Sequence, residues 1–358
     1  MTDNLEHPAY EPTPGVFRGR PRPAQDRILK VALFIESSRS SGRALLTGIS
    51  NYARHHGHWA FYWEPGGLAE AWPRLRSLDA DGIILRDFDA VDEVMALGLP
   101  AIVVGHRRGE IPGVANVITD SVTIGRMAAE HLLERRFQHF AYCGFEDTPW
   151  STIRGEVFSR RIAEAGYPTH VYTSPPASPT GRWKRQLQQM ARWLQTLPQP
   201  LGLMACNDDR GQHVIEACKI SGLRVPEQIA IIGADNDELV CELSDPPLSS
   251  VAINFERAGF ESAELLDQLM QNRRTQPAAI HVHATHIVTR RSTDILALED
   301  HGVAKALRYI QAQARGPIHV NDVARAAGLS RRVLEKRFRK LLDRSVLHQI
   351  RRVRVDQI

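Results

Sequence analysis

Residues 320–342 read VNDVARAAGLSRRVLEKRFRKLL. Apolar residues recur with helical spacing on both sides of the short segment 327–330, which contains Gly328. The pattern predicts two short helices joined by a turn, with glycine in the turn and Ser330 as the N-cap of the second helix. This arrangement is the helix-turn-helix motif, so the chain is expected to carry a small all-α unit here.

Charge is divided unevenly between this unit and the rest of the chain. Residues 301–358 contain 14 Lys and Arg against 4 Asp and Glu, a net charge of +10. The first 300 residues contain the remaining 31 Lys and Arg against 37 Asp and Glu, a net charge of −6. A basic helical segment next to an acidic body indicates an appended nucleic-acid-binding element.

The helix that follows Ser330 is expected to bury one face and expose the other. Leu334, Phe338 and Leu341 are spaced i, i+4 and i+7, so they should face the core of the helical unit. The second helix of such a motif normally enters the major groove of DNA. The side chains on its opposite face are Arg331, Arg332, Glu335, Lys336 and Arg339.

Strand and helix patterns alternate from Ile28 onward. The expected strands of a first series are 28–35, 60–63, 82–85, 101–105 and 117–119, with helices at 43–56 and 122–136. A second series has strands at 139–145, 171–173, 201–205 and 229–234, with helices at 154–165, 183–197 and 210–221. This alternation predicts an α/β fold with parallel sheets and helices on both faces, and the two series predict two lobes of similar design.

Polar side chains crowd the positions that follow the expected strands. Ligands of open α/β sheets bind outside the carboxyl ends of the strands. Carboxylates, amides and guanidinium groups together suit a ligand rich in hydroxyl groups, because each hydroxyl both donates and accepts hydrogen bonds. The alternative is that these loops are polar because water surrounds them. Candidates chosen from strand-end position alone are Glu36, Arg39, Asp87 and Asp120.

Composition excludes several other classes of protein. With 358 residues, 43% of them hydrophobic and 24% charged, the chain is expected to be globular with two or three domains. It has no apolar run near the roughly 18 residues that a membrane helix needs. Residues 1–26 are polar and rich in proline, without a signal-peptide core, so we expect a flexible leader and a cytoplasmic protein. The four cysteines lack C-x-x-C spacing and are expected to be buried thiols.

Patterns typical of metal sites and enzymes are weak or missing. His281, His283 and His286, and the group at 55–58, have no Cys or carboxylate at ligand spacing and are expected to lie on the surface. The sequence has no glycine-rich nucleotide motif and no nucleophile elbow. We therefore expect no metal, no cofactor and no catalytic residue, so that the protein is not an enzyme.

Residues 28–293 resemble the effector-binding domain of LacI/GalR-type regulators, which has a two-lobed type I periplasmic-binding-protein fold. The resemblance is carried by STIRGEVF at 151–158, ACND at 205–208, IIGADND at 231–237, LSSV at 248–251 and RRST at 290–293. LEKRF at 334–338 resembles the AraC/XylS-type DNA-binding domain. LacI/GalR regulators have DNA-binding helices ahead of the first strand, whereas here only 27 mostly polar residues precede Ile28.

The resemblance implies a sugar-responsive transcription regulator whose effector is xylose or a related aldose. Asp235 matches the aspartate that accepts hydrogen bonds from sugar hydroxyls, and Arg154 matches the arginine that contacts the sugar from the second lobe. Asn207 and Asp208 match the Asn-Asp pair of the family, which implies that Asn207 is nearer the ligand and that Asp208 either contacts the ligand or only holds the loop. An aromatic platform under the sugar is expected from Trp150 or from a phenylalanine at position 88. The alternative function is a sugar-binding transport component, which would need a secretory signal and has no use for the basic helices.

The resemblance also implies a domain plan and a mode of DNA binding. The expected parts are a leader at 1–26, an effector domain at 27–295 and a DNA-binding domain at 296–358. Lobe 1 should comprise about 27–137 with 254–275, and lobe 2 about 138–253 with 276–293. An AraC-type domain has two helix-turn-helix units joined by a long helix, and 346–358 resembles that helix. The sequence is thus either a fragment or a natural half-sized reader of double-stranded DNA, expected to act as a homodimer. Base contacts are expected from Arg332, Glu335 and Lys336, and phosphate contacts from Arg331, Arg339 and Arg351.

Overall fold

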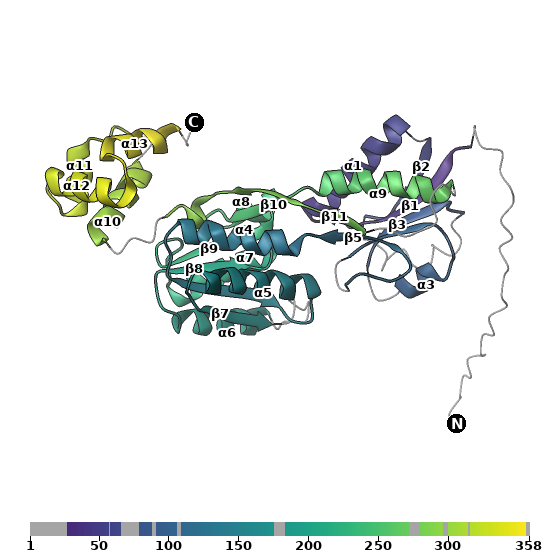
Figure 1. The fold of residues 1–358 in the computed structure, drawn as a ribbon, viewed down its shortest axis with the longest axis horizontal. Coiled ribbons are helices and arrows are strands. Elements are labelled where there is room, and N and C mark those ends of the chain that lie inside the picture. Colours follow the sequence, from purple (N-terminus) through teal and green to yellow (C-terminus); the bar gives the residue numbers. More distant parts are fainter. Residues whose placement is uncertain are drawn as a thin grey trace, which may run out of the picture.

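The computed structural model describes residues 27–56, 58–65, 79–87, 91–105, 109–174, 183–271, 279–295, 300–313 and 316–355. The expected leader and the phenylalanine at 88 lie outside these ranges. Two α/β lobes lie next to each other, and the C-terminal helices lie beside the second lobe (Figure 1). The predicted fold class is confirmed: two parallel-dominated sheets with helices on both faces, followed by an all-α segment.

Lobe 1 is built on a six-stranded sheet of order β11-β5-β4-β3-β1-β2, in which every described pairing is parallel. Its strands are β1 Leu29–Phe34, β2 Trp59–Trp63, β3 Gly82–Arg86, β4 Ala101–Val104, β5 Ala115–Thr119 and β11 Ala279–Val282. The helices α1 Ser40–His56 and α9 Phe255–Met270 cover one face of this sheet, and α3 Val91–Met95 covers the other. The core is the apolar layer on each face.

Lobe 2 repeats this plan. Its sheet has the order β12-β10-β9-β8-β6-β7, which matches that of lobe 1 strand for strand. The strands are β6 His139–Phe145, β7 Thr169–Ser174, β8 Leu201–Ala205, β9 Ile229–Asp235, β10 Ser249–Ile253 and β12 Ala284–Val288. One face carries α4 Ser121–Glu134 and α5 Pro149–Glu164, and the other carries α6 Trp183–Gln195 and α7 Asp208–Ser221. A short helix, α8 Glu238–Leu243, follows β9, and a 3-10 turn, η1 Arg291–Thr293, follows β12. Among the described strands, only the β10–β12 pair is antiparallel.

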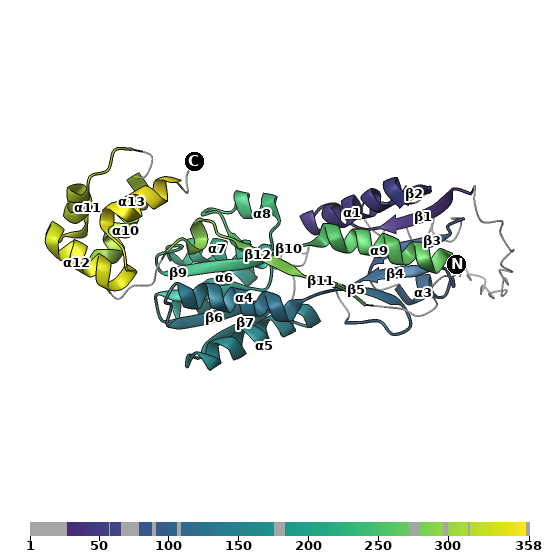
Figure 2. The same ribbon diagram turned by 45° about the horizontal axis from the view of Figure 1, so that its top comes forward.

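Helices α1 and α9 lie side by side in both ribbon views (Figures 1 and 2) and pack unusually closely. A Cβ atom on Gly48 of α1 would lie 1.9 Å from the carbonyl oxygen of Glu256, and one on Gly259 of α9 would lie 2.1 Å from that of Leu45. These distances are far below contact distance, so only glycine allows the two backbones to meet. The contact ties residues near the start of the chain to residues 200 positions later.

The chain crosses between the lobes at three places: after β5, after β10 and between β11 and β12. Asp120 caps α4 at the first crossing, and Asn254 caps α9 at the second. The third crossing is hydrogen-bonded to the other two crossings: the Asp120 amide donates to the Val282 carbonyl, and the Asn254 amide donates to the His283 carbonyl. Lobe 2 therefore begins at α4 rather than near residue 138, and β11 belongs to lobe 1 rather than to lobe 2. The physical reason is that β11 pairs with β5 and α4 packs on α5.

The C-terminal unit consists of α10 His301–Gln313, α11 Val320–Ala327, α12 Arg331–Leu342 and α13 Val346–Val355. The helix-turn-helix prediction is confirmed. Gly328 ends α11 with a φ of 67°, and the Ser330 hydroxyl caps α12 by accepting from the amide of Val333. Leu334 and Phe338 are fully buried, as predicted.

Two details of the predicted helices are wrong. The first concerns the core face of α12: Leu341 packs against the core as predicted, but it is only partly buried, and the prediction missed Leu342, which is buried there. Helix α5 begins at Pro149 instead of 154, since proline is favoured in the first turn, where its missing N–H costs nothing. The four cysteines are buried free thiols, as expected.

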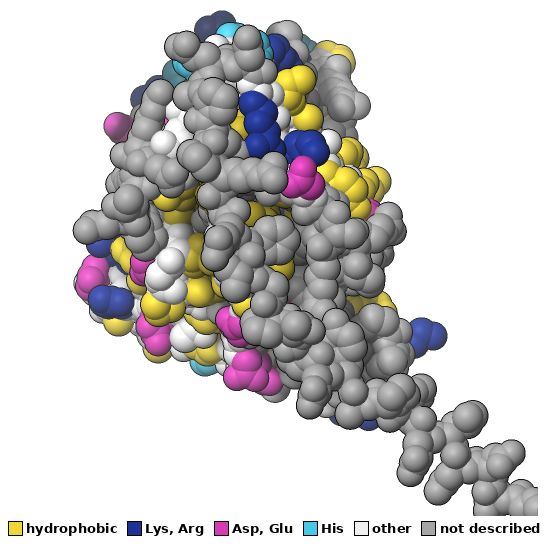
Figure 3. All heavy atoms as spheres, turned by 90° about the vertical axis from the view of Figure 1, so that its right-hand side faces the viewer, with side chains coloured by type: hydrophobic (Ala, Val, Ile, Leu, Met, Phe, Trp, Pro, Cys, Tyr) yellow, Lys and Arg dark blue, Asp and Glu magenta, His cyan; other side chains and the backbone are white. Residues whose placement is uncertain are grey.

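The outer end of lobe 1 exposes apolar side chains. Figure 3 looks at this end and shows hydrophobic side chains at the surface. On the edge strand β2, the exposed fractions of Phe61 and Trp63 are 41% and 45%. Within the described residues, no helix combines the length and apolar character needed to span a bilayer.

Candidate functional site

A cleft opens between the two lobes at the carboxyl ends of the parallel strands. Its empty volume is about 760 Å³, including the open solvent at its mouth. This is the position that the fold predicts for a ligand. Both lobes contribute to its lining: Arg39, Ser40, Ser41, Arg86, Val104, Gly105, Val117, Thr119, Phe255 and Val282 from lobe 1, and Trp150, Arg154, Asn207, Asp208, Asp209, Asp235, Asp237 and Val240 from lobe 2.

Asp235 and Arg154 form the charged centre of the lobe 2 wall. The Arg154 side chain is 3% exposed, and its Nη2 donates to the Asp235 carboxylate over 3.3 Å. Its Nη1 donates to the Cys206 carbonyl over 2.6 Å, and its guanidinium lies 4.7 Å from the centre of the Trp150 ring. Burial raises the pKa of the Asp235 carboxyl, although Arg154 acts in the opposite direction. Because Asp235 retains 26% exposure, it can still accept a bond from a ligand in the cleft.

Asn207 and Asp208 line the cleft, but their side chains already form hydrogen bonds to the loops beside it. The Asn207 side-chain oxygen caps α7 by accepting from the Arg210 amide. The Asp208 carboxylate accepts from the Ser250 hydroxyl over 2.6 Å and from the Asp237 amide over 2.7 Å. Burial raises the pKa of Asp208 well above its ordinary value, and the charge of Asp235 adds to this effect. Asp208 is therefore placed to support the loop, the role considered for it from the sequence.

Direct bonds join the two lobes across the mouth of the cleft. Arg39 of lobe 1 pairs with Asp209 of lobe 2 through two contacts, Nη2–Oδ1 at 2.7 Å and Nε–Oδ2 at 3.1 Å. The Ser40 amide, at the start of α1, donates to the Asp237 carboxylate over 2.8 Å. These contacts form only when the lobes are close, so they stabilise the closed arrangement of the cleft.

Three of the residues predicted from strand-end position do not line the cleft. Glu36 is exposed to solvent. Asp87 is buried and is not among the lining residues, and its amide donates to the Val104 carbonyl. Asp120 caps α4 in the hinge, where its carboxylate accepts from the Thr123 amide and hydroxyl and lies 3.6 Å from His283. Burial acts to raise the pKa of Asp120, but these hydrogen bonds outweigh it and lower the pKa.

The sequence-based candidate set omits residues that do line the cleft, above all Arg86 at the end of β3. Burial lowers the pKa of the Arg86 guanidinium, while Glu36, Asp235 and Asp87 act against this. Its Nε is buried and has no hydrogen-bond partner among the described residues. The Arg154 Nε and the Asp237 Oδ1 share this property. Three residues that line the cleft thus each carry one buried polar atom without a partner among the described residues, two donors and one acceptor.

The predicted DNA-reading face lies on α12. Arg331, Arg332, Lys336 and Arg339 are exposed there, as is Arg351 on α13. Glu335 is only partly exposed, and its Oε2 is buried without a hydrogen-bond partner among the described residues. The middle of α12 is tied to the start of α10 by Arg337, which donates to both carboxylate oxygens of Asp300 at 3.1 and 3.2 Å. Five basic side chains are therefore presented on one compact helical unit.

Comparisons with known proteins agree with this architecture. The periplasmic binding protein-like domain family matches residues 129–293. The xylose operon regulatory protein of Escherichia coli strain K12 is 31% identical over 327 residues, which are 88% of this chain and 83% of that protein. The chain belongs to the xylose operon regulator family.

Further members and a solved structure extend the match over nearly the whole chain. The xylose operon regulatory protein of Haemophilus influenzae is 29% identical over 335 residues, covering 91% of this chain and 86% of that protein. A solved structure of a xylose-binding transcription activator has a TM-score of 0.70 at 28% identity, covering 91% of this chain and 86% of that chain. As a member of the xylose operon regulator family, the protein is a sugar-responsive transcription regulator, which confirms the function predicted from the sequence. Regulators of this family bind a sugar effector and DNA, and they are not enzymes.

Proposed function

We propose that the effector is D-xylose or a closely related aldose, bound between the lobes by Asp235, Arg154 and Arg86. The observation that carries this proposal is the set of unpaired polar atoms on residues that line the cleft: Nε of Arg86, Nε of Arg154 and Oδ1 of Asp237. A buried donor or acceptor without a partner costs about 1–3 kcal/mol. A polyhydroxylated ligand satisfies both kinds at once, because a hydroxyl accepts from an arginine and donates to an aspartate.

Trp150 is proposed as the apolar surface against which the sugar ring lies. It lines the cleft, and the guanidinium of Arg154 lies against its ring. The names of the relatives support xylose as the first sugar to test. Asn207 is proposed as a secondary contact, since its side-chain oxygen already caps α7.

The output is proposed to be control of carbohydrate-utilisation genes by a cytoplasmic homodimer. Arg332 and Lys336 are proposed to read base edges, and Arg331, Arg339 and Arg351 to bind phosphates; the exposure of all five side chains supports this. Sugar regulates DNA binding only if it favours one arrangement of the lobes, and closure of the hinge is the proposed change. The bonds Arg39–Asp209 and Ser40–Asp237 would form on closure.

A thermal-shift screen of pentoses and hexoses tests the effector. A sugar that binds only the folded protein raises its midpoint of unfolding, and at one hundred times its Kd the gain is about 2.7 kcal/mol. We expect D-xylose to give the largest shift of the set. A matched screen of Arg154→Ala should lose that shift. If a hexose or no sugar stabilises the wild-type protein, the assignment of D-xylose is wrong.

A further inference from the structure

The loop that carries Asp235 has an unusual backbone. Asp235 and Asn236 have φ values of 99° and 51°, in the region that non-glycine residues rarely adopt. Such a conformation persists only where the surrounding structure holds it. Two of the holding contacts come from within lobe 2: the Asn236 amide donates to the Ser250 hydroxyl over 3.0 Å, and the Asp237 amide donates to Asp208 over 2.7 Å.

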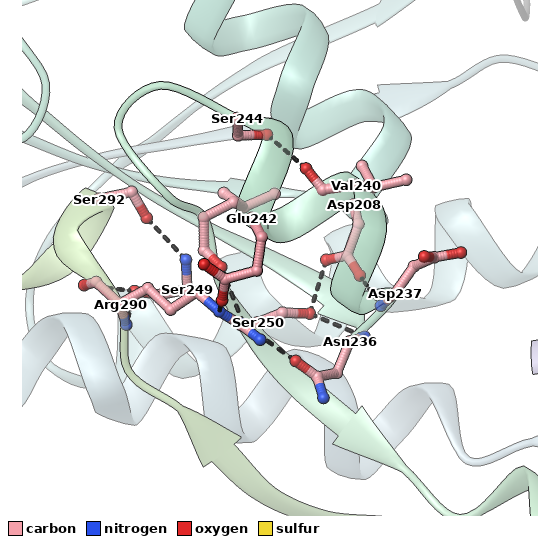
Figure 4. A network of polar contacts seen from close by, with 11 residues as sticks. Asp208, Asn236, Asp237, Val240, Glu242, Ser244, Ser249, Ser250, Arg290 and Ser292 are labelled. Carbon is pink, nitrogen blue, oxygen red and sulfur yellow. Dashed lines mark hydrogen bonds and ion pairs between the residues drawn. The ribbon is translucent and has the colours of Figure 1, made fainter. Parts of the chain in front are cut away.

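The third holding contact comes from Arg290, 54 residues further along the chain. Its Nη1 donates to the side-chain oxygen of Asn236 over 2.9 Å and to the Leu248 carbonyl over 3.1 Å. Its Nε donates to Glu242 of α8 over 2.6 Å. Figure 4 shows this network, in which one guanidinium joins the ligand loop, α8 and the entry to β10. The Arg290 side chain is 11% exposed, so these bonds are largely shielded from water.

Arg290 also opens the segment through which the chain leaves the effector domain. Ser292 donates to the Ile231 carbonyl of β9 over 2.6 Å, and Thr293 lies against α4, with its hydroxyl 2.8 Å from His131. Asp300 then accepts from the amides of Gly302 and Val303 at the start of α10, and it holds Arg337 of the DNA-reading helix. Arg290 thus joins the ligand loop to the start of the segment 290–295, and the DNA-binding unit follows from Asp300 onward.

We propose that Arg290 is the positioning residue that transmits occupancy of the cleft to the DNA-binding helices. Sugar bound at Asp235 alters the loop 235–237, Asn236 passes the change to Arg290, and Arg290 shifts or stiffens the segment 290–295. The step from sugar to loop rests on the proposed function. The step from loop to segment rests only on the contacts of Arg290. These two steps can be tested separately.

The decisive variant is Asn236→Gly, because glycine accepts the positive φ and only the amide bonded to Arg290 is lost. A second variant, Arg290→Lys, retains the charge, but one ammonium cannot reach Asn236, Glu242 and the Leu248 carbonyl together. The matched control is Arg257→Gln. It removes an arginine–glutamate pair of similar length, 2.7 Å, from the exposed surface of α9.

Hydrogen–deuterium exchange on the full chain, with and without saturating D-xylose, provides the measurement. The reporters are the hydrogen-bonded amides of Arg290 and residues 292–295. Without sugar, Asn236→Gly should speed their exchange by about tenfold or more, the effect of losing one hydrogen bond to a charged group. D-xylose should slow their exchange in the wild-type protein and in Arg257→Gln, and should have no effect on them in Asn236→Gly or Arg290→Lys.

The possible results separate the two proposals. If sugar protects the loop 235–237 of the wild-type protein but leaves 290–295 unchanged, Arg290 is not a relay. Equal exchange of these amides in the sugar-free wild-type protein and Asn236→Gly leads to the same conclusion. If D-xylose protects neither region, the effector assignment fails, and the sugar-free comparison alone decides the role of Arg290.

Discussion

Replacing Asp235 tests the sugar-binding cleft most directly. Its φ of 99° disfavours alanine, so Asp235→Asn is the better substitution, because asparagine tolerates positive φ and keeps the shape of the side chain. The asparagine oxygen can still accept from Arg154, but the variant loses one charged acceptor for a sugar hydroxyl. A hydrogen bond to a charged group contributes about 1.5–3 kcal/mol, so sugar affinity should fall about ten- to hundredfold.

The same substitution should alter the pH dependence of binding. Burial raises the pKa of Asp235, and its ionised form is the acceptor, so wild-type affinity should fall as pH drops through this raised pKa. Asp235→Asn should show no such fall. Calorimetry with D-xylose across the acidic range measures both effects. Asp147→Asn is the matched control, since Asp147 also has a positive φ but is exposed and lies outside the cleft lining. Unchanged affinity and pH dependence in Asp235→Asn would remove Asp235 from the site.

Three further expectations concern DNA binding, lobe closure and acid stability. Arg332→Ala should reduce the preference for particular bases, at a cost of about 1–3 kcal/mol in the free energy of DNA binding. Arg351→Ala should instead weaken binding to all DNA sequences about equally, and the slope of log affinity against log salt concentration should become about one unit less steep. Footprinting at several salt concentrations measures both effects. Asp209→Asn breaks the exposed bridge to Arg39, so sugar affinity should fall by less than about fivefold, and scattering at saturating sugar should show a less compact particle. Burial, with the charges of Arg210 and Arg39, lowers the pKa of His213 to about 3. The folded protein therefore keeps His213 neutral, and the stability that depends on this neutral imidazole is present above pH 6.5 and is lost as the pH falls toward 3. Between about pH 6 and 4, the unfolding free energy of wild type relative to His213→Gln should fall by about 1.4 kcal/mol per pH unit, measured by urea titration; a constant difference would contradict it.

The local patterns of the sequence were sufficient for most of the strands and helices up to residue 234, for the repeated lobe plan and for the helix-turn-helix, but β10, α9, β11 and β12 were not predicted. Strand alternation and helical spacing depend on near neighbours, and a glycine with a following N-cap serine marks the turn at Gly328 and Ser330. The family motifs also pointed to Asp235 and Arg154, and both residues line the cleft from lobe 2. These features depend on contacts within a few residues, or on short motifs, so they can be recognised in one sequence.

Which polar strand-end residues face the cleft was decided only by the tertiary structure. Arg86, the last residue of β3, lines the cleft, whereas its neighbour Asp87 is buried and does not line it. Asp120 follows a strand as expected, but the chain changes lobes there and the carboxylate caps α4.

Long-range contacts were equally beyond sequence reasoning. The bridge from Arg39 to Asp209 spans 170 residues, and the contact of Arg290 with Asn236 spans 54. No periodicity or spacing in the sequence encodes such pairs, because the first exists only once the two lobes lie against each other and the second only once the lobe 2 sheet has formed. The residue types at the cleft were therefore readable from the sequence, whereas their partners were set by the fold.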